Sequence, residues 1–268
     1  MTHQTPTLPM PTRARIALDA AVANRNPISL EDVVENAALQ TRVDKKFLLT
    51  PKKFTDFTAR LGQEFSVMQI DGLRTFRYRS TYFDTEDFEQ YIAHRQGRRR
   101  RYKVRSRTYV DTDLCMFEVK TKGRRGTTVK HRREQPMADA NVLTLANQEF
   151  VAEVLAQEYE LEVPELRPVM HNAYRRATLV NPRDGERVTC DVELHFANDT
   201  VRVHGPDMVI VETKSADGRG VSDQALAALG IRPVSMSKYC LGIASLHPEL
   251  SANKWSRLLR RHEWTRAA

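Results

Sequence analysis

Charged and uncharged residues alternate along several segments in the middle of the chain. In residues 103–107 a lysine or arginine occupies every second position, and in residues 117–122 Glu118, Lys120 and Lys122 alternate with less polar residues. Side chains of a β-strand point alternately to opposite faces of a sheet. The pattern therefore predicts strands with one apolar face and one charged face.

The same alternation occurs around residues 130–132, 187–193 and 212–214. A solvated sheet face would explain any single strand. The repetition, and the mixing of acids with cations, favours instead a sheet that closes so that these faces line one lumen. Because charges inside a lumen repel one another and are costly to bury, a bound polyanion and a divalent metal held by the acids would balance them.

The remaining signals predict an α+β fold. Periodicity, turn residues and helix caps place strands at residues 41–49, 65–69, 76–83, 98–109, 114–122, 127–134, 169–180, 186–196, 200–204 and 208–214. Helices are expected at residues 29–39, 51–61, 141–159, 222–230, 237–246 and 253–261. We expect residues 1–27, which are rich in proline, to be a flexible leader, residues 28–250 to form the main domain, and residues 251–268 to form a basic C-terminal helix.

The composition narrows the function classes. The 268 residues carry 42 Lys and Arg against 34 Asp and Glu, a formal charge of +8, which favours an anionic partner. No apolar run approaches the roughly 18 residues of a membrane-spanning helix, and no signal-peptide core begins the chain, so we expect a cytoplasmic protein. Cys115, Cys190 and Cys240 have neither disulfide nor zinc spacing. Few aromatic residues punctuate the basic faces, which argues against a specific nucleic-acid partner.

At this point the chain resembles the VTC (vacuolar transporter chaperone) domain of the triphosphate tunnel metalloenzyme, or CYTH-like, superfamily. The resemblance runs from about residue 42 to residue 246. It rests on the joint order of short motifs at residues 42–47 (RVDKKF), 80–85 (STYFDT), 103–109 (KVRSRTY), 117–120 (FEVK), 174–176 (YRR), 187–191 (RVTCD), 211–214 (VETK) and 237–239 (SKY).

The resemblance implies a fold and an activity. The fold would be an eight-stranded antiparallel β-barrel that forms a tunnel, with helices packed outside and a C-terminal helix at one tunnel end. The activity would be that of a phosphotransferase of the polyphosphate polymerase type, which binds ATP, triphosphate and polyphosphate with Mn²⁺ or Mg²⁺ and transfers the γ-phosphate to a polyphosphate chain. Eukaryotic members work with membrane proteins, so a membrane-protein partner is also expected.

The motifs and the charged faces together name the candidate site residues. The catalytic candidates, matched by motif, are Lys46, Arg105, Arg107, Lys120, Arg176 and Lys238. The substrate-binding candidates are Arg42, Lys103, Lys122, Lys130, Arg132, Arg187, Lys214 and Ser237. The metal-ligand candidates are Glu212, Glu118 and Asp44. Arginine forms bidentate contacts with phosphate, lysine acts as a mobile point charge, and carboxylates supply hard oxygen ligands.

One position bears on the reaction. The triphosphatase branch of the superfamily carries Glu-x-Glu-x-Lys on its first strand, where this chain has Arg42, Asp44 and Lys46. Replacing the first acid by arginine favours binding of phosphate over binding of metal and water. Three functions stay open: a polyphosphate polymerase, an inorganic or nucleoside triphosphatase of the same fold, and a non-catalytic sensor of polyphosphate or nucleotide.

Overall fold

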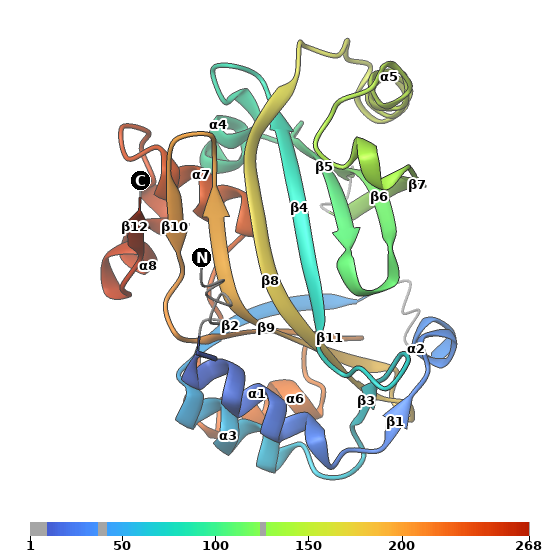
Figure 1. Ribbon diagram of the computed structural model, residues 1–268, viewed down its shortest axis with the longest axis vertical. Helices are drawn as coiled ribbons and strands as arrows, with labels where there is room; N and C mark the ends of the chain where they lie inside the picture. Colours follow the sequence, from blue (N-terminus) through green and yellow to red (C-terminus); the bar gives the residue numbers. More distant parts are fainter. Residues whose placement is uncertain (1–9, 37–41, 124–126, 268) are drawn as a thin grey trace, which may run out of the picture. The chain divides into compact units, whose positions relative to one another are not determined.

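The computed structural model of the protein describes residues 10–36, 42–123 and 127–267 (Figure 1). The predictions for residues 1–9, 37–41, 124–126 and 268 lie outside the described residues. The contacts divide the chain into two compact units. Unit 1 comprises Met1–Arg74, Ala177–Glu193 and Asp207–Pro233, and unit 2 comprises Thr75–Arg176, Leu194–Pro206 and Val234–Ala268.

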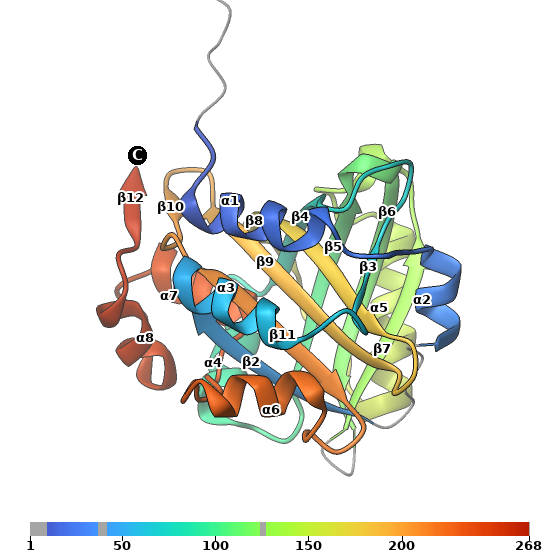
Figure 2. The ribbon, with the colours of Figure 1, turned by 90° about the horizontal axis from the view of Figure 1, so that it is seen from below.

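Unit 1 is built on three antiparallel strand segments. These are β2 (Val43–Leu49), β11 (Val209–Ser215) and the first part of β9 (Glu186–Ala197), with β11 between the other two. Their apolar side chains form one core with α1 (Arg13–Ala23), α3 (Pro51–Arg60) and α6 (Val221–Ala228), which lie together in Figure 2. The smaller elements are α2 (Leu30–Asn36), β1 (Pro27–Ile28) and β3 (Ser66–Met68), which pairs with β1 and with the end of β8 (Arg167–Asn181).

Unit 2 is built on a longer antiparallel sheet. Its central strands run in the order β8, β4 (Phe76–Asp84), β5 (Tyr102–Tyr109), β6 (Leu114–Lys122) and β7 (Thr128–Glu134), and β4 to β6 are visible side by side in Figure 1. The end of β9 pairs with β10 (Arg202–His204), which pairs with β12 (Thr265–Ala267). The helices of this unit are α4 (Glu89–Gln96), α5 (Leu145–Tyr159), α7 (Lys238–Leu246) and α8 (Ser256–Arg261), with 3-10 turns at Val110–Thr112, Met137–Asp139 and Asn253–Trp255.

The predicted α+β class, with a large antiparallel sheet and helices packed on it, is confirmed. The sheet differs from the expected barrel in two ways. It has twelve strands rather than eight, because the short strands β1, β3, β10 and β12 join it. Among the described strands it does not close on itself, since β7 pairs only with β6 and β2 only with β11. Lys130, Arg132 and Glu134 at alternate positions of β7 are exposed and charged, which is how natural sheets protect an open edge.

The predicted flexible leader is wrong for residues 13–23, which form α1. The Thr12 side chain caps this helix by accepting the Arg15 N–H at 3.1 Å. Ala14, Leu18 and Val22 follow at a spacing of four residues and are buried in the core of unit 1. A helical stripe of this kind folds because of what it packs against, so the proline-rich composition around it was a poor guide.

Two other segments differ from the sequence prediction. The strand expected from residue 98 begins at Tyr102, and residues 89–96 before it form α4, which the sequence did not predict. The helix expected at residues 253–261 is present as a 3-10 turn followed by α8. It is followed by β12 rather than by more helix. The three cysteines are free and buried.

Gly242 allows α7 to pack closely within unit 2. A methyl group added at this position would lie 2.0 Å from Met170 Sδ and 2.8 Å from Phe196 Cδ1, and both side chains are buried. Alanine is normally the better helix former by about 0.5–1 kcal/mol. Here the steric cost of the added methyl group outweighs this gain, because a packed interior rearranges only partly around an added group.

We therefore expect Gly242→Ala to lower the free energy of unfolding by about 1–3 kcal/mol, as measured by urea denaturation. In the double variant with Met170→Ala the cost should be smaller than the sum of the two single costs, since the closest clash is gone. A Gly242→Ala protein as stable as the wild type would contradict this packing.

Candidate functional site

The charged face predicted from the sequence forms on the sheet of unit 2. Arg105 pairs across the sheet with Tyr82 and Glu118, and Lys120 pairs with Lys103 and Lys130. Because directly paired residues point to the same side, the register defines a cationic face. It is formed by Tyr78, Ser80 and Tyr82 of β4, Lys103, Arg105 and Arg107 of β5, Glu118, Lys120 and Lys122 of β6, Lys130 and Arg132 of β7, and Asn172, Tyr174 and Arg176 of β8.

Glu118 is the buried counter-ion of this face. Its side chain has no solvent exposure. One carboxylate oxygen contacts Arg105 Nε at 2.6 Å and Nη2 at 2.5 Å, and the other contacts Lys130 Nζ at 2.6 Å. Arg105 also donates from Nη1 to the Tyr82 hydroxyl at 3.1 Å. The carboxylate is thus surrounded by cations, and this geometry gives no support to the metal role predicted for Glu118.

The charges on the face are strongly coupled. Burial alone would raise the pKa of Glu118, but Arg105, Arg107 and the neighbouring lysines hold it well below its usual range. The Arg105 guanidinium, together with burial, lowers the pKa of Lys120 well below its ordinary value. Burial likewise lowers the pKa of Lys130. The charged form of Lys120 is therefore repelled by the neighbouring cations, and a bound anion would offset this repulsion.

Aromatic rings brace several cations of the face. Tyr78 and Tyr174 stack with their ring centroids 5.2 Å apart and 8° between their planes. The Arg176 guanidinium lies 5.3 Å from both ring centroids, Arg107 lies 5.8 Å from that of Tyr78, and Lys238 Nζ lies 4.3 Å from that of Tyr174. Burial raises the pKa of Tyr78 to about 12, so its ring is neutral. Cation–π contacts of this kind hold a cation without cancelling its charge.

The N-terminus of α7 is fixed at the Tyr82 end of the face. Ser237 caps the helix, since its hydroxyl accepts the Cys240 N–H at 3.5 Å. The Tyr239 ring lies 5.2 Å from that of Tyr82, and its hydroxyl donates to the Asp84 carboxylate. Burial raises the pKa of Asp84. This carboxylate also accepts backbone N–H groups at the start of α4, so it ties two helices to one strand.

Unit 1 carries a separate row of alternating charges on β2 and β11. Lys214 Nζ contacts Glu212 Oε1 at 2.5 Å and Asp44 Oδ2 at 3.1 Å. Arg42 Nε contacts the other oxygen of Asp44 at 3.0 Å, and Lys46 Nζ lies 3.3 Å from Glu212 Oε1. Burial lowers the pKa of Lys214, against the opposite effect of the two acids. The register places Arg187 of β9 opposite Lys214.

Asp44 and Glu212 fit the chemistry of a divalent metal better than Glu118 does. Both carboxylates contact the same ammonium nitrogen, so they converge on a point where a cation already lies. The Asp44 side chain is 36% exposed and that of Glu212 is 18% exposed. Mg²⁺ is commonly bound by one or two carboxylates together with water and phosphate oxygens. Among the described residues no group of three or more acids, histidines or cysteines forms a metal cage.

The remaining predicted residues lie at the margins of these two clusters. Lys122 is partly exposed at the end of β6, Arg132 is exposed opposite Glu118, and Lys103 is partly buried opposite Lys120. The predicted set is therefore divided between two groups. Unit 1 holds Arg42, Asp44, Lys46, Arg187, Glu212 and Lys214, and unit 2 holds the rest.

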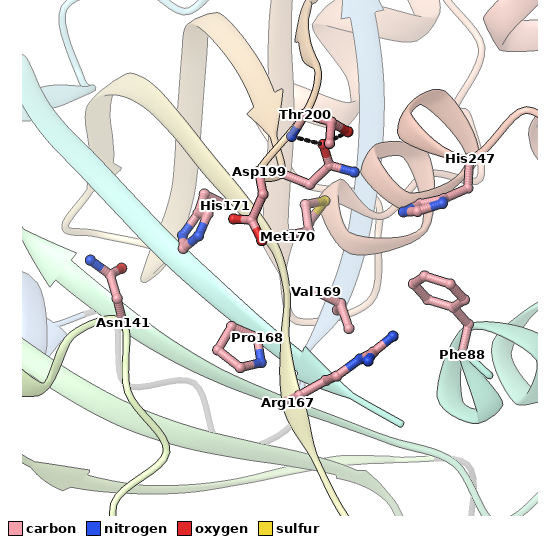
Figure 3. A pocket seen from close by; sticks show the side chains of 11 residues that line it. Phe88, Asn141, Arg167, Pro168, Val169, Met170, His171, Asp199, Thr200 and His247 are labelled. Carbon is pink, nitrogen blue, oxygen red and sulfur yellow. Dashed lines mark hydrogen bonds between the residues drawn. The ribbon is translucent and has the colours of Figure 1, made fainter. Parts of the chain in front are cut away.

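Two cavities of about 630 and 610 Å³ lie within unit 2. None of the predicted site residues lines them. In the first, Arg167 extends toward Phe88, whereas His171 and Asp199 lie beside one another, away from Phe88 and His247 (Figure 3). The second is bordered by Arg79, Thr81 and His171, which alternate with residues of the cationic face, and also by Ser80 and Asn172 of that face. No lysine or arginine of the cationic face borders either cavity, and we assign neither to the site.

The sequence prediction missed the neutral members of the cationic face. Tyr78, Ser80 and Asn172 are buried and in register with the arginines. The signal that could have identified them is their spacing. They occupy alternate positions of β4 and β8, in phase with Tyr82 and Tyr174, and Ser80 itself begins the motif at residues 80–85.

A family model for the VTC domain matches residues 41–247, and the chain belongs to this family. A search of curated protein sequences gives no match. Among solved structures, the chain is similar to one from Hippeastrum described as an adenylyl cyclase, HpAC1, with a dominant triphosphatase activity. The identity is 14%, the coverage is 76% of this chain and 96% of that one, and the TM-score is 0.48.

Two further solved structures are more distant. The PH1012 protein of Pyrococcus horikoshii OT3 is 11% identical over 72% of this chain and 92% of that one, with a TM-score of 0.32. The S. pombe RNA triphosphatase Pct1 is 11% identical over 97% and 95%, with a TM-score of 0.26. None of the described helices has the length and apolar character needed to span a membrane.

We expect Glu118→Gln to lower the free energy of unfolding by about 3–5 kcal/mol, because it leaves Arg105 buried without its counter-charge. Urea denaturation at neutral pH measures this. Because the folded-state pKa of Glu118 is depressed, its stabilising contribution is present above the unfolded pKa of about 4.3 and is lost as the pH falls toward the folded value. Glu134→Gln, at an exposed position of β7, is the matched control. A cost no larger than the control's would refute the counter-ion role.

Lys120→Met should have the opposite effect on stability. The variant removes a cation whose pKa is depressed by Arg105 and by burial, so we expect the free energy of unfolding without anion to rise by about 0.5–2 kcal/mol. The folded wild type binds fewer protons than the unfolded chain between the two pKa values of Lys120. The free energy of unfolding of the wild type therefore rises with pH in that interval. The difference in stability between Lys120→Met and the wild type should shrink accordingly. A variant less stable than the wild type would contradict this account.

Proposed function

We propose that this VTC-domain protein binds a phosphate chain and acts as a metal-dependent phosphotransferase of the polyphosphate polymerase type. The observation that carries the proposal is the cationic face of unit 2. Arg105 and Arg107 are held there by tyrosine rings and by one buried carboxylate, and Lys120 lies beside them on the same face. The positive charge that remains is matched by a polyanion.

The spacing of the cations favours a chain over a single anion. Alternate residues along a strand are about 6.8 Å apart, and cations recur at this spacing along β5, β6 and β7. Arginine offers a planar fork to phosphoryl oxygens, and lysine adds adaptable point charges. Phosphoryl transfer depends mainly on positioning and on stabilisation of negative charge, and this arrangement suits both.

The contacts of Asp44 favour transfer to a phosphate chain over hydrolysis. Both of its oxygens contact cations, Arg42 at one and Lys214 at the other. A carboxylate engaged in this way is poorly placed to activate water as a base. Mn²⁺ or Mg²⁺ would be held by Asp44 and Glu212 of unit 1 and would supply Lewis-acid chemistry there.

Binding can be tested by calorimetric titration of sodium tripolyphosphate into the purified protein with and without MnCl₂. We expect Lys120→Met to weaken binding at least tenfold, about 1.4 kcal/mol, although it stabilises the protein. Lys52→Met is the control, because Lys52 lies on α3 and is 86% exposed. Glu212→Gln should reduce the effect of Mn²⁺ on binding. Equal affinity in Lys120→Met and wild type would refute the cationic face as the binding site.

The reaction is tested separately with ATP and MnCl₂. Products are examined for long polyphosphate on gels and for free phosphate by colorimetry. Long chains that disappear in Lys120→Met support the polymerase. Free phosphate without long chains would show that the protein is a triphosphatase instead of a polymerase. Binding of tripolyphosphate without either product would show that the protein is a non-catalytic sensor instead of a polymerase.

A further inference from the structure

Buried polar atoms without hydrogen-bond partners gather at one level of the cationic face. Ser80 of β4 pairs with Arg107 on one side and with Asn172 on the other. Ser80 is 3% exposed and Asn172 is 2% exposed. Among the described residues, no partner is present for Ser80 Oγ, for either polar atom of the Asn172 side chain, or for Arg107 Nε.

Such a group calls for a ligand. Buried polar atoms in folded proteins are nearly always hydrogen-bonded to protein or to ordered water, because an unpaired buried donor or acceptor loses its hydration without compensation. Here four such atoms belong to three residues that are neighbours across adjacent strands. The Tyr174 hydroxyl, two residues along β8 on the same face, is also without a partner among the described residues.

The hydrogen-bonding capacity of the group defines the ligand. Arg107 Nε, the Asn172 amide nitrogen and the Ser80 hydroxyl are donors, as phosphoryl oxygens require. Asn172 Oδ1 is an acceptor and needs a donor. An internal phosphoryl group of a phosphate chain has no hydrogen to offer. A terminal one carries a proton below its second pKa, near 6 for phosphate monoesters, and the acceptor would favour the protonated form.

We propose that Ser80, Asn172 and Arg107 form a subsite that binds the terminal phosphoryl group of a phosphate chain. This inference rests on the proposed function and goes beyond it, because it assigns the chain end to one level of the face. The next level along the strands carries Arg105 with Glu118, and beyond it lie Lys103, Lys120 and Lys130. The rest of the chain would follow these lysines.

The test compares a phosphate chain that has ends with one that has none. Linear tripolyphosphate and cyclic trimetaphosphate are titrated separately into the wild type and the variants. Asn172→Leu removes both unpaired amide atoms and keeps the branching at the γ-carbon. It should weaken tripolyphosphate binding about tenfold and change trimetaphosphate binding less than twofold. Its melting temperature without anion should equal or exceed that of the wild type, because leucine leaves no unpaired polar atom.

Two further variants keep the proposal testable if Asn172→Leu does not fold. Ser80→Ala should weaken tripolyphosphate binding severalfold. Asn172→Asp keeps the shape and places a carboxylate against the phosphate, so tripolyphosphate binding should be lost. Ser106→Ala is the matched control, because Ser106 lies between Arg105 and Arg107 on the other side of the sheet and accepts a hydrogen bond from Gln135. It should bind both anions like the wild type.

The outcomes separate this inference from the proposed function. If the wild type binds neither anion, both fail. If tripolyphosphate binding needs Lys120 but is unaffected by the Ser80 and Asn172 substitutions, the function stands and the subsite is wrong. If those substitutions weaken both anions equally, the residues contact phosphate without selecting a chain end, and the inference is overturned.

Discussion

The contact of Glu118 with Arg105 and Lys130 is the interaction on which the rest of unit 2 depends. A carboxylate without solvent exposure is stable only because cations surround it, and Arg105 is buried only because that carboxylate is present. Breaking such a pair from one side is far more costly than the net stabilisation it provides. The pair therefore fixes β5 and β6 in register, and with them the positions of Arg107 and Lys120.

The other cations of the face are held differently. Tyr78 and Tyr174 contact Arg107, Arg176 and Lys238 through their ring faces, and cation–π contacts leave the charge of the cation in place. The positive potential of the face is thereby kept rather than cancelled. This explains why one lysine at its centre, Lys120, is held in an unfavourable environment. Functional sites commonly retain such locally destabilising groups, at a cost in stability.

The sequence predicted part of this arrangement for a clear physical reason. Strict alternation along β5 and β6 placed Arg105, Arg107 and Glu118 on one face, and the register agrees. The aromatic braces were not predicted, because a tyrosine such as Tyr78 is equally at home in an apolar core. The convergence of Asp44 and Glu212 on Lys214 depends on the pairing of β2 with β11, which lie far apart in sequence. No local sequence pattern predicts that pairing, and none predicts that β7 is an open edge.

The helix α1 shows the opposite failure. Its cap and its stripe of Ala14, Leu18 and Val22 were present in the sequence, but the surrounding prolines dominated the interpretation. α4 had a weaker signal, since it is eight residues long and begins after Phe88 in a left-handed conformation without a side-chain cap. Local propensity identifies long periodic elements well and short ones poorly, because short helices depend on tertiary contacts.

The two-sided nature of β5 restricts how this protein can change over evolutionary time. Val104 packs in the core with α5, while its neighbours Lys103 and Arg105 belong to the opposite face. Inserting or deleting a single residue inside the strand would exchange the two faces for the part of the strand beyond it, sending guanidinium groups into the core and valine onto the cationic face. Length variation among descendants of this chain should therefore be confined to the connections between strands, where it leaves the alternation intact.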